Sequence, residues 1–513
     1  MKARTIMVQG TASSVGKSVV ATALCRLFLQ EGLRVAPFKA QNMALNAAVT
    51  ADGGEIGRAQ AVQAAAAKVA PTVDMNPILL KPEGDRRSQV VVLGKPIGSL
   101  GAVDYQERKP ELRETVRAAL ERLRAAYDVV VIEGAGSPAE VNLKERDVVN
   151  MFVAEAAQAP VILVGDIDRG GVFAAFVGTL DLLEPAERAR VGALLVNKFR
   201  GDKRLFESGV RFLEERTCVP VLGVLPYVRG LSLAEEDSVA LDERRGRRRA
   251  RPDEIEIAVV LVPRISNYDD FLPLEHEPGV VVRFVESARD VEGADLVVLP
   301  GTKSTIADLG WVLESGFGAA LMARARRGEP ILGICGGCQM LGERIDDPDG
   351  VESSDPHVAG LGVLPIATRF ARDKRTTQVT AHAAVPSFLT GGAALAEPVA
   401  GYEIHMGAVE PTAPIARAFA LATRNGTPVS ALDGAIAGDG AIVGTMLHGL
   451  FENDALRART LGALRDRRGL PAPPRAAPIP TKQAEYDRLE AAVRGSVDLD
   501  LLWRIARLAP RAL

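Results

Sequence analysis

The 513-residue chain has few cysteines, almost no net charge and no long apolar run, and each shortage excludes a class of protein. Four cysteines are too few for a disulfide framework in a chain of this length, and they fit a reducing compartment. A formal net charge of −3 argues against broad binding to nucleic acid. The longest apolar runs, such as DVVVIEGAG and APVILVGD, are too short to span a bilayer.

The first residues, MKARTIMVQGTASSVGKS, enter a strand and a loop at once, without the basic and then apolar pattern of a secretory leader. We therefore expect a cytoplasmic protein that acts on small molecules and has no nucleic-acid or membrane partner. A single basic run, residues 243–251, is interpreted as a solvated linker rather than a nucleic-acid patch. These features leave the oligomeric state open.

The sequence predicts two α/β domains joined by a linker. Apolar runs alternate with helical patterns over residues 1–235, which is typical of a doubly wound parallel sheet. A charged stretch at 236–253 predicts the linker. A second α/β domain is expected over 254–455, and a C-terminal tail over 456–513 should contain a helix at 481–495. The expected buried strands are 5–10, 33–39, 128–134, 160–166 and 192–198 in the first domain, and 255–263, 280–285, 294–301, 330–335 and 440–449 in the second.

A phosphate-binding loop is predicted where the first strand meets the first helix. The sequence GTASSVGKS places Gly10, Thr11 and Gly16 in the turn, and Lys17 and Ser18 at the start of the helix. Backbone N–H groups and the helix N-terminus attract phosphate there. Lys17 can reach the β- and γ-phosphates, and the Ser18 hydroxyl can bind Mg²⁺.

Five residues, rather than the standard four, separate the two glycines, and this longer loop resembles the dethiobiotin-synthetase-like branch of P-loop enzymes. The resemblance implies that ATP phosphorylates a carboxylate.

Other polar residues fit a nucleotide site by their place at strand ends. Lys39 ends the second strand, and Glu133 ends the strand 128–134, where a carboxylate can reach Mg²⁺. Asn197 follows another strand and could contact adenine. Ligands of open α/β sheets bind at the carboxyl ends of the strands. Glu55 is a further Mg²⁺ candidate, or else a solvated loop residue.

The stretch ILGICGGCQMLG, residues 331–342, predicts a thiol nucleophile on a tight strand-to-helix turn. Small residues at 333, 336 and 337 allow the strained turn that presents Cys335, and the following helix N-terminus favours the thiolate. The C-x-x-C spacing is also that of a redox pair. A zinc site would need a second pair of ligands, which the surrounding sequence lacks.

His448 is the candidate base for this thiol, because it follows an apolar strand and can reach the same sheet edge. It can take the thiol proton and return it to a leaving amine. The backbone N–H groups of Gly301 and Gly336 are the candidate oxyanion hole. His405, in GYEIHMG, is either a structural histidine or a support for this site.

The motifs G-I-C-G-G-x-Q, LPGTKST and LHG resemble class I glutamine amidotransferase domains. The resemblance implies that Cys335 attacks the side-chain amide of glutamine, which gives a glutamyl thioester and ammonia. Most of that class has a glutamate two positions after the histidine, where this chain has Leu450. In lacking this glutamate, the chain resembles the cobyrinate-amidating branch of the class, which works with a Cys–His dyad. The residue that orients His448 is therefore left open. Cys338 is expected to be a packing residue.

Motifs from residue 1 to about 460, among them PFKAQNMALN, GDIDRGGVFA, NKFRGD and PRISNYDDF, resemble the cobyric acid synthase family. The resemblance implies a ligase of cobalamin biosynthesis that amidates the b, d, e and g carboxylates of adenosylcobyrinic acid a,c-diamide, with glutamine as nitrogen donor and ATP and Mg²⁺ as cofactors. The nearest alternative is a cobyrinic acid a,c-diamide synthase. Alternatives from other classes are a P-loop switch or partitioning ATPase and a glutaminase-like regulator.

Overall fold

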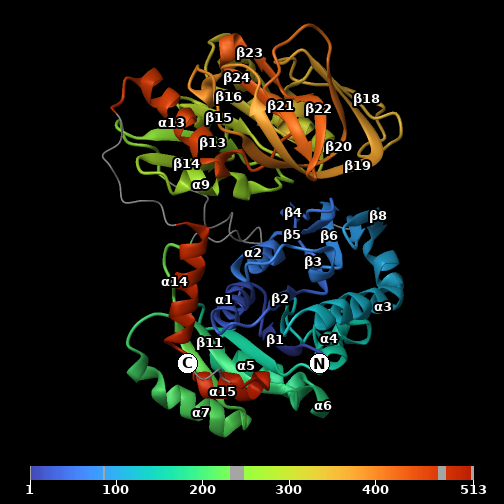
Figure 1. The fold of residues 1–513 in the computed structure, drawn as a ribbon, viewed down its shortest axis with the longest axis vertical. Coiled ribbons are helices and arrows are strands. Elements are labelled where there is room, and N and C mark those ends of the chain that lie inside the picture. The colour runs from blue at the N-terminus through green and yellow to red at the C-terminus, as the bar shows by residue number, and fades with distance from the viewer. Residues whose placement is uncertain (1, 85–86, 232–247, 472–480, 510–513) are drawn as a thin grey trace. The chain divides into compact units, whose positions relative to one another are not determined.

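The computed structural model describes residues 2–84, 87–231, 248–471 and 481–509 (Figure 1). The chain forms two compact units. The first unit consists of residues 1–44, 56–235 and 480–513, and the second of residues 45–55 and 236–479. The mixed α/β class with parallel sheets is confirmed, whereas the division of the chain differs from the expected one in two places.

The first unit is built on a six-stranded parallel sheet of order β12-β11-β10-β1-β9-β2. Its strands are β1 (Arg4–Gly10), β2 (Val35–Phe38), β9 (Val129–Glu133), β10 (Val161–Asp166), β11 (Val191–Phe199) and β12 (Val221–Pro226). Alternate residues of one strand contribute to two separate cores: Val130 and Ile132 belong to one, and Val129 and Val131 to the other. Both faces of the sheet are therefore covered, which is why these strands read as continuous apolar runs.

Helices cover both faces of this sheet, and a smaller sheet stands beside it. The helices are α1 (Lys17–Gln30), α2 (Arg58–Ala66), α3 (Ala102–Ala126), α4 (Met151–Ala157), α5 (Val172–Leu182), α6 (Pro185–Arg188) and α7 (Glu207–Thr217). The small sheet has the order β3-β6-β7-β8 and consists of β3 (Gln41–Met43), β6 (Ile78–Gly84), β7 (Arg87–Val92) and β8 (Lys95–Gly101).

The second unit contains a six-stranded sheet of order β14-β13-β15-β16-β24-β23. Its strands are β13 (Ile255–Val260), β14 (Val280–Val285), β15 (Leu296–Leu299), β16 (Ile331–Ile334), β23 (Ala435–Ala437) and β24 (Ile442–Thr445), and all are parallel except β23. Its helices are α9 (Leu272–Glu275), α10 (Thr305–Glu314), α11 (Phe317–Arg326), α12 (Gly336–Leu341) and α13 (Asp454–Arg468).

A second, mostly antiparallel sheet in this unit was not predicted from the sequence. It consists of β17 (Arg344–Asp346), β18 (His357–Ala359), β19 (Ile366–Ala383), β20 (Val399–Pro411), β21 (Phe419–Arg424) and β22 (Thr427–Asp433). The long β19 and β20 pair along most of their length. The alternation of charged and apolar residues in ARDKRTTQVTAHA does not show which strand pairs with it, so the topology of this sheet could not be predicted.

The expected C-terminal tail is two separate pieces. Helix α13 contacts β13 and belongs to the second unit, whereas α14 (Lys482–Arg494) and α15 (Leu499–Ala506) belong to the first. Arg26 of α1 binds Asp487 at 2.7 Å, and the ring of Phe28 lies 5.6 Å from that of Trp503. Tail helices with a buried apolar face thus complete the core layer over α1.

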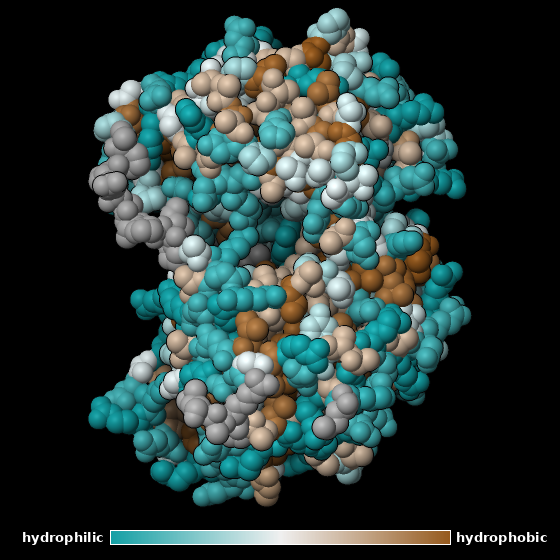
Figure 2. Space-filling model, viewed as in Figure 1, coloured by the Kyte–Doolittle hydropathy of each residue, from teal (hydrophilic) through white to brown (hydrophobic). Residues whose placement is uncertain are grey.

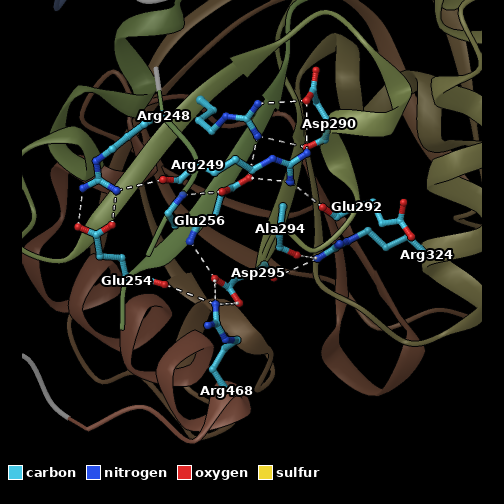
Figure 3. A network of polar contacts seen from close by, with 12 residues as sticks. Arg248, Arg249, Glu254, Glu256, Asp290, Glu292, Ala294, Asp295, Arg324 and Arg468 are labelled. Atoms are coloured by element: carbon cyan, nitrogen blue, oxygen red, sulfur yellow. Dashed lines mark hydrogen bonds and ion pairs between the residues drawn. The ribbon is translucent and has the colours of Figure 1, made fainter. Parts of the chain in front are cut away.

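Most of the expected linker, residues 236–247, lies outside the described residues. The described end of the basic run is held by acidic side chains of the second unit (Figure 3). Arg248 binds Glu254 at 2.5 Å, and Arg249 binds Asp290 at 3.3 Å and Glu256 at 3.4 Å. These two arginines are therefore neutralised within the protein.

Hydrophilic residues cover much of the face in view, and apolar residues occur on it in small groups (Figure 2). Large exposed apolar side chains of the first unit include Met43, Ile97 and Val103. Among the described residues, no single helix is both long enough and apolar enough to cross a bilayer. Helices α10 and α11 reach that length and hydropathy only when taken together, and they are bent by 81° at their junction.

Candidate active sites

The loop between β1 and α1 forms a tight cradle at the carboxyl end of the first sheet. Gly16 has φ +97°, and a Cβ on it would lie 2.1 Å from Asn197 Nδ2, so only glycine fits. Thr11 N–H donates to Val164 O at 2.9 Å, which ties the loop to β10. Lys17 Nζ donates to the carbonyls of Ala12 at 2.9 Å and Gly136 at 3.0 Å. The lysine is thus folded over the cradle in which a phosphate would sit.

Three predicted residues, Ser18, Lys39 and Glu133, meet beside this loop. Glu133 Oε1 accepts from Ser18 Oγ at 2.8 Å and from Lys39 Nζ at 2.9 Å, and its Oε2 accepts from Gln63 at 2.5 Å. Burial raises the pKa of Glu133, but the charge of Lys39 and the hydrogen bonds from Lys39, Gln63 and Ser18 bring it below its ordinary value. The carboxylate is therefore ionised when it faces the loop. Gln63 was not predicted from the sequence, since it lies within an alanine-rich helix with no motif around it.

The donor atoms at this point suit a magnesium ion. A hydroxyl and a carboxylate oxygen are hard ligands, and Mg²⁺ is usually held by one or two such groups together with water and phosphate oxygens. Ser18 and Glu133 would hold it. No cluster of three or more His, Cys, Asp or Glu that could hold a metal ion occurs among the described residues.

Two other predicted residues have different surroundings from those expected. Asn197 Nδ2 donates to Val15 O at 2.8 Å, so the side chain supports the phosphate loop from behind. Glu55 is fully buried, and its Oε2 binds Lys374 at 2.5 Å within the second unit. We therefore assign Glu55 to this ion pair rather than to magnesium. The sequence did not reveal this, because its partner is 319 residues away.

The turn after β16 places Cys335 in a strained conformation, with φ 50° and ψ −111°. The glycines on either side of Cys335 are packed too closely to carry a side chain. A Cβ on Gly337 would lie 1.8 Å from Leu299 O, and one on Gly333 would lie 2.6 Å from Leu341. Cys335 N–H donates to Thr445 O at 2.8 Å, which joins the turn to β24. This is the geometry of a nucleophile elbow.

His448 follows β24 and is completely buried beside Cys335. Its Nδ1 lies 2.7 Å from Asp270 Oδ2, and the other oxygen of Asp270 accepts from Gly449 N–H at 2.8 Å. Burial lowers the pKa of His448, but the charge and hydrogen bond of Asp270, with a smaller contribution from Cys335, raise it to about 10. The ring of Tyr402 stacks on the imidazole at 5.2 Å.

Asp270 therefore orients His448, the task that a glutamate performs in most of the class and that Leu450 cannot perform. It comes from the short helix η4 (Tyr268–Phe271), 178 residues before His448. The pair Asp269–Asp270 in PRISNYDDF was visible in the sequence, but nothing in it indicated which acid would turn toward the histidine.

The predicted oxyanion-hole glycines lie around the same two side chains. A Cβ on Gly301 would lie 2.8 Å from His448 Cε1, and one on Gly336 would lie 2.6 Å from Thr302, the residue after Gly301. The segment Gly301–Thr302 is thus packed between the histidine and the turn that follows Cys335.

The two remaining candidate residues, Cys338 and His405, are both buried. Cys338 is fully buried, and a Cβ on Gly444 would lie 2.8 Å from its Sγ; burial raises the pKa of this thiol far above the ordinary value. His405 is buried in β20, and its Nδ1 lies 3.0 Å from Gly407 O. The carbonyl of Ile404, next to it, accepts from Cys335 Sγ at 3.6 Å.

A strained thiol with a buried His–Asp pair, and a lysine-containing phosphate loop with a carboxylate beside it, define a class: a glutamine amidotransferase unit carried by the same chain as a P-loop nucleotide-binding unit. Comparison with known families agrees. Residues 256–456 match the CobB/CobQ-like glutamine amidotransferase domain, and residues 6–240 match the CobQ/CobB/MinD/ParA nucleotide binding domain.

Whole-chain relatives narrow the class. Cobyric acid synthase of Sorangium cellulosum (strain So ce56) is 61% identical over 100% of both chains. The enzyme of the same name from Dehalococcoides mccartyi (strain CBDB1) is 50% identical over 98% of this chain and 99% of its own, and that from Salmonella enteritidis PT4 (strain P125109) is 50% identical over 98% of both. The chain belongs to the cobyric acid synthase family.

Proposed function

We propose that the chain amidates the b, d, e and g carboxylates of adenosylcobyrinic acid a,c-diamide, with glutamine as nitrogen donor and ATP and Mg²⁺ as activators. The observation that carries the proposal is the Cys335–His448–Asp270 arrangement together with the Lys17–Ser18–Glu133 site in one chain of this family. The two sites supply the two half-reactions that such an amidation needs.

In the second unit, His448 holds the proton taken from the thiol on Nε2, as its raised pKa favours, while Asp270 keeps the other proton on Nδ1. The Cys335 sulfur attacks the side-chain amide carbon of glutamine, and the N–H groups of Gly301 and Gly336 stabilise the oxyanion. His448 then returns the proton to the leaving nitrogen, and ammonia departs. Water hydrolyses the thioester, which gives glutamate and restores the thiol.

In the first unit, a carboxylate of the corrinoid attacks the γ-phosphorus of ATP and displaces ADP, which gives an acyl phosphate. This activation is needed because a free carboxylate is a poor acyl electrophile. Lys17 and the loop N–H groups bind the phosphates, and Lys39 faces the same carboxylate as Ser18. Magnesium, held by Ser18 and Glu133, would neutralise charge on the phosphates. Ammonia then displaces phosphate from the acyl phosphate and forms the amide.

Mass spectrometry tests the proposal directly. Purified protein is incubated with adenosylcobyrinic acid a,c-diamide, ATP, Mg²⁺ and amide-¹⁵N glutamine, and we expect uptake of one labelled nitrogen for each of the b, d, e and g groups. No uptake, with cobyrinic acid labelled at its a and c groups instead, would show a cobyrinic acid a,c-diamide synthase. ATP hydrolysis with neither product would favour a switch ATPase.

Two variants test the division of labour. Cys335→Ser should lose synthesis from glutamine and keep synthesis from ammonium. Lys17→Ala should lose both, since the acyl phosphate no longer forms. A cysteine variant that also lost the ammonium reaction would contradict the two-site scheme.

A further inference from the structure

Lys109 of helix α3 is a buried lysine that makes no hydrogen bond or ion pair with the described residues. Its exposed fraction is 8%. The ring of Tyr105, one turn earlier in the helix, lies 5.8 Å from Nζ and attracts a cation only weakly at that distance. Lysine is rarely buried without a partner, because its ammonium group loses hydration. A ligand with a negative charge would supply the partner that the protein does not.

The charges around Lys109 are mostly of its own sign. Burial lowers the pKa of its ammonium group, Arg113 and Arg146 lower it further, and Asp147 opposes them. The oxygens of Asp147 already accept four hydrogen bonds, at 2.8 to 3.2 Å, from backbone N–H groups at the start of α4. These bonds fill the acceptor sites of a carboxylate. Lys109, Arg113 and Arg146, here named the cationic cluster, therefore carry more charge than the neighbouring acid offsets.

Arg113 fixes the segment that carries Arg146. Its guanidinium donates to Asp147 O at 3.0 Å and to Glu145 O at 2.9 Å. These bonds hold the short helix η2 (Val141–Arg146) against α3. Arg146 itself is exposed, and it forms no hydrogen bond or ion pair within the described part of the chain. Its guanidinium is therefore available to a ligand.

Two chain segments connect the cationic cluster to the nucleotide site of the same unit. In the first, Tyr105 Oη donates to Gln41 Oε1 at 2.5 Å, and Gln41 lies two residues after Lys39, at most about 7 Å along the chain. In the second, the loop after β9 accepts from Lys17 through Gly136 O at 3.0 Å and then continues into η2. The cluster therefore lies on the side of the unit where the acyl phosphate would form.

We propose that Lys109 and Arg146 bind a peripheral carboxylate of the corrinoid while another carboxylate of the same molecule is phosphorylated. The proposal rests on the proposed function, which gives the substrate four such groups. When the first of them reacts, the other three are negatively charged at neutral pH, since a free carboxyl group has a pKa of about 4. The second contact holds the reacting carboxylate in place at the nucleotide site. A flexible lysine accepts carboxylates from different directions, which suits a substrate that must turn between amidations.

Equilibrium dialysis tests this subsite with adenosylcobyrinic acid a,c-diamide as the probe, and synthesis from ammonium is measured in parallel. Lys109→Met keeps the length of the side chain and removes its charge. The Kd and the KM for the corrinoid should rise about 10- to 100-fold, the range of one hydrogen bond to a charged group. The KM for ATP and the rate of glutamine hydrolysis should not change. Lys109→Arg keeps the charge and should stay close to wild type.

Arg146→Gln should weaken corrinoid binding in the same direction. It changes an exposed residue, so the test does not depend on the folding of one buried variant. Lys144→Met is the matched control, because it removes a positive charge from η2 that Glu184 and Glu187 already pair, at 3.3 and 2.8 Å. This variant should bind the corrinoid like wild type. A corrinoid whose peripheral carboxylates are all amidated is the matched ligand, and Lys109→Met should not change its Kd.

Three results would overturn the proposal. They are a wild-type Kd for the substrate in both Lys109→Met and Arg146→Gln, an equal loss of affinity for the amidated corrinoid, and a higher KM for ATP in place of the corrinoid effect. A wild-type protein that binds the corrinoid but does not amidate it with ammonium would refute the proposed function instead. In that case the dialysis still decides whether Lys109 and Arg146 bind carboxylates.

Discussion

Asp270→Asn is the sharpest perturbation of the glutaminase site. Both oxygens of Asp270 are used, one at 2.7 Å from His448 Nδ1 and one at 2.8 Å from Gly449 N. Asparagine has the same shape but one acceptor, so either the histidine or the glycine loses its partner. The imidazolium that forms when Cys335 gives up its proton also loses its counter-charge inside a fully buried site, where burial alone lowers the pKa of His448.

We expect the glutaminase kcat of the variant to fall by about 10²- to 10⁴-fold, the range that general acid–base catalysis contributes, which corresponds to about 2.7–5.4 kcal/mol. The KM for glutamine should change little, and synthesis from ammonium should persist. Glutamate release over a range of pH measures the effect. Asp347→Asn is the control, because that carboxylate is equally buried but accepts only from the N–H groups of 351–353. Wild-type hydrolysis by Asp270→Asn would refute the triad and leave a dyad of Cys335 and His448.

Three further outcomes follow from other sites. Glu133→Gln should abolish ATP-driven synthesis from glutamine and ammonium alike while glutamate release continues; retained synthesis would contradict its role beside Lys39. Burial raises the pKa of Glu403, but hydrogen bonds from His405, Arg424 and Thr377 bring it to about 2 from an ordinary 4.5. The resulting stability is present above pH 4.5 and lost as the pH falls toward 2, so Glu403→Gln should flatten the pH dependence of the unfolding midpoint between about pH 4.5 and pH 2. Gly337→Ala should lower unfolding free energy by about 1–3 kcal/mol and abolish glutamate release, since its Cβ would meet Leu299 O; normal melting would refute this.

Features set by neighbouring residues could be predicted from the sequence. The parallel strands of both main sheets, the loop around Lys17 and the turn at Cys335 depend on short apolar runs and on glycines a few positions apart. Strands that are buried on both faces carry this signal most clearly, as the run from Val129 to Glu133 shows.

Features set by distant pairings could not be predicted. Asp270 reaches His448 across 178 residues, and Glu55 reaches Lys374 across 319. In each case the residue type was visible, but the choice among several nearby acids depends on how the chain turns over the sheet edge. The excursion of 45–55 into the second unit is likewise invisible in composition, because its small apolar residues would fit either core.

Because α14 and α15 pack over α1, the core of the first unit cannot be completed on the ribosome until the end of the chain has been synthesised. Tyr486, Leu489 and Trp503 complete the core that contains Leu24 and Phe28, yet they are synthesised roughly 250 residues after the first unit's last strand. At a translation rate of about 5–20 residues per second, the apolar surface that α14 and α15 will bury stays without these helices for on the order of 10–50 s. The nascent protein must therefore keep one face of its first sheet protected while the whole second unit is being made.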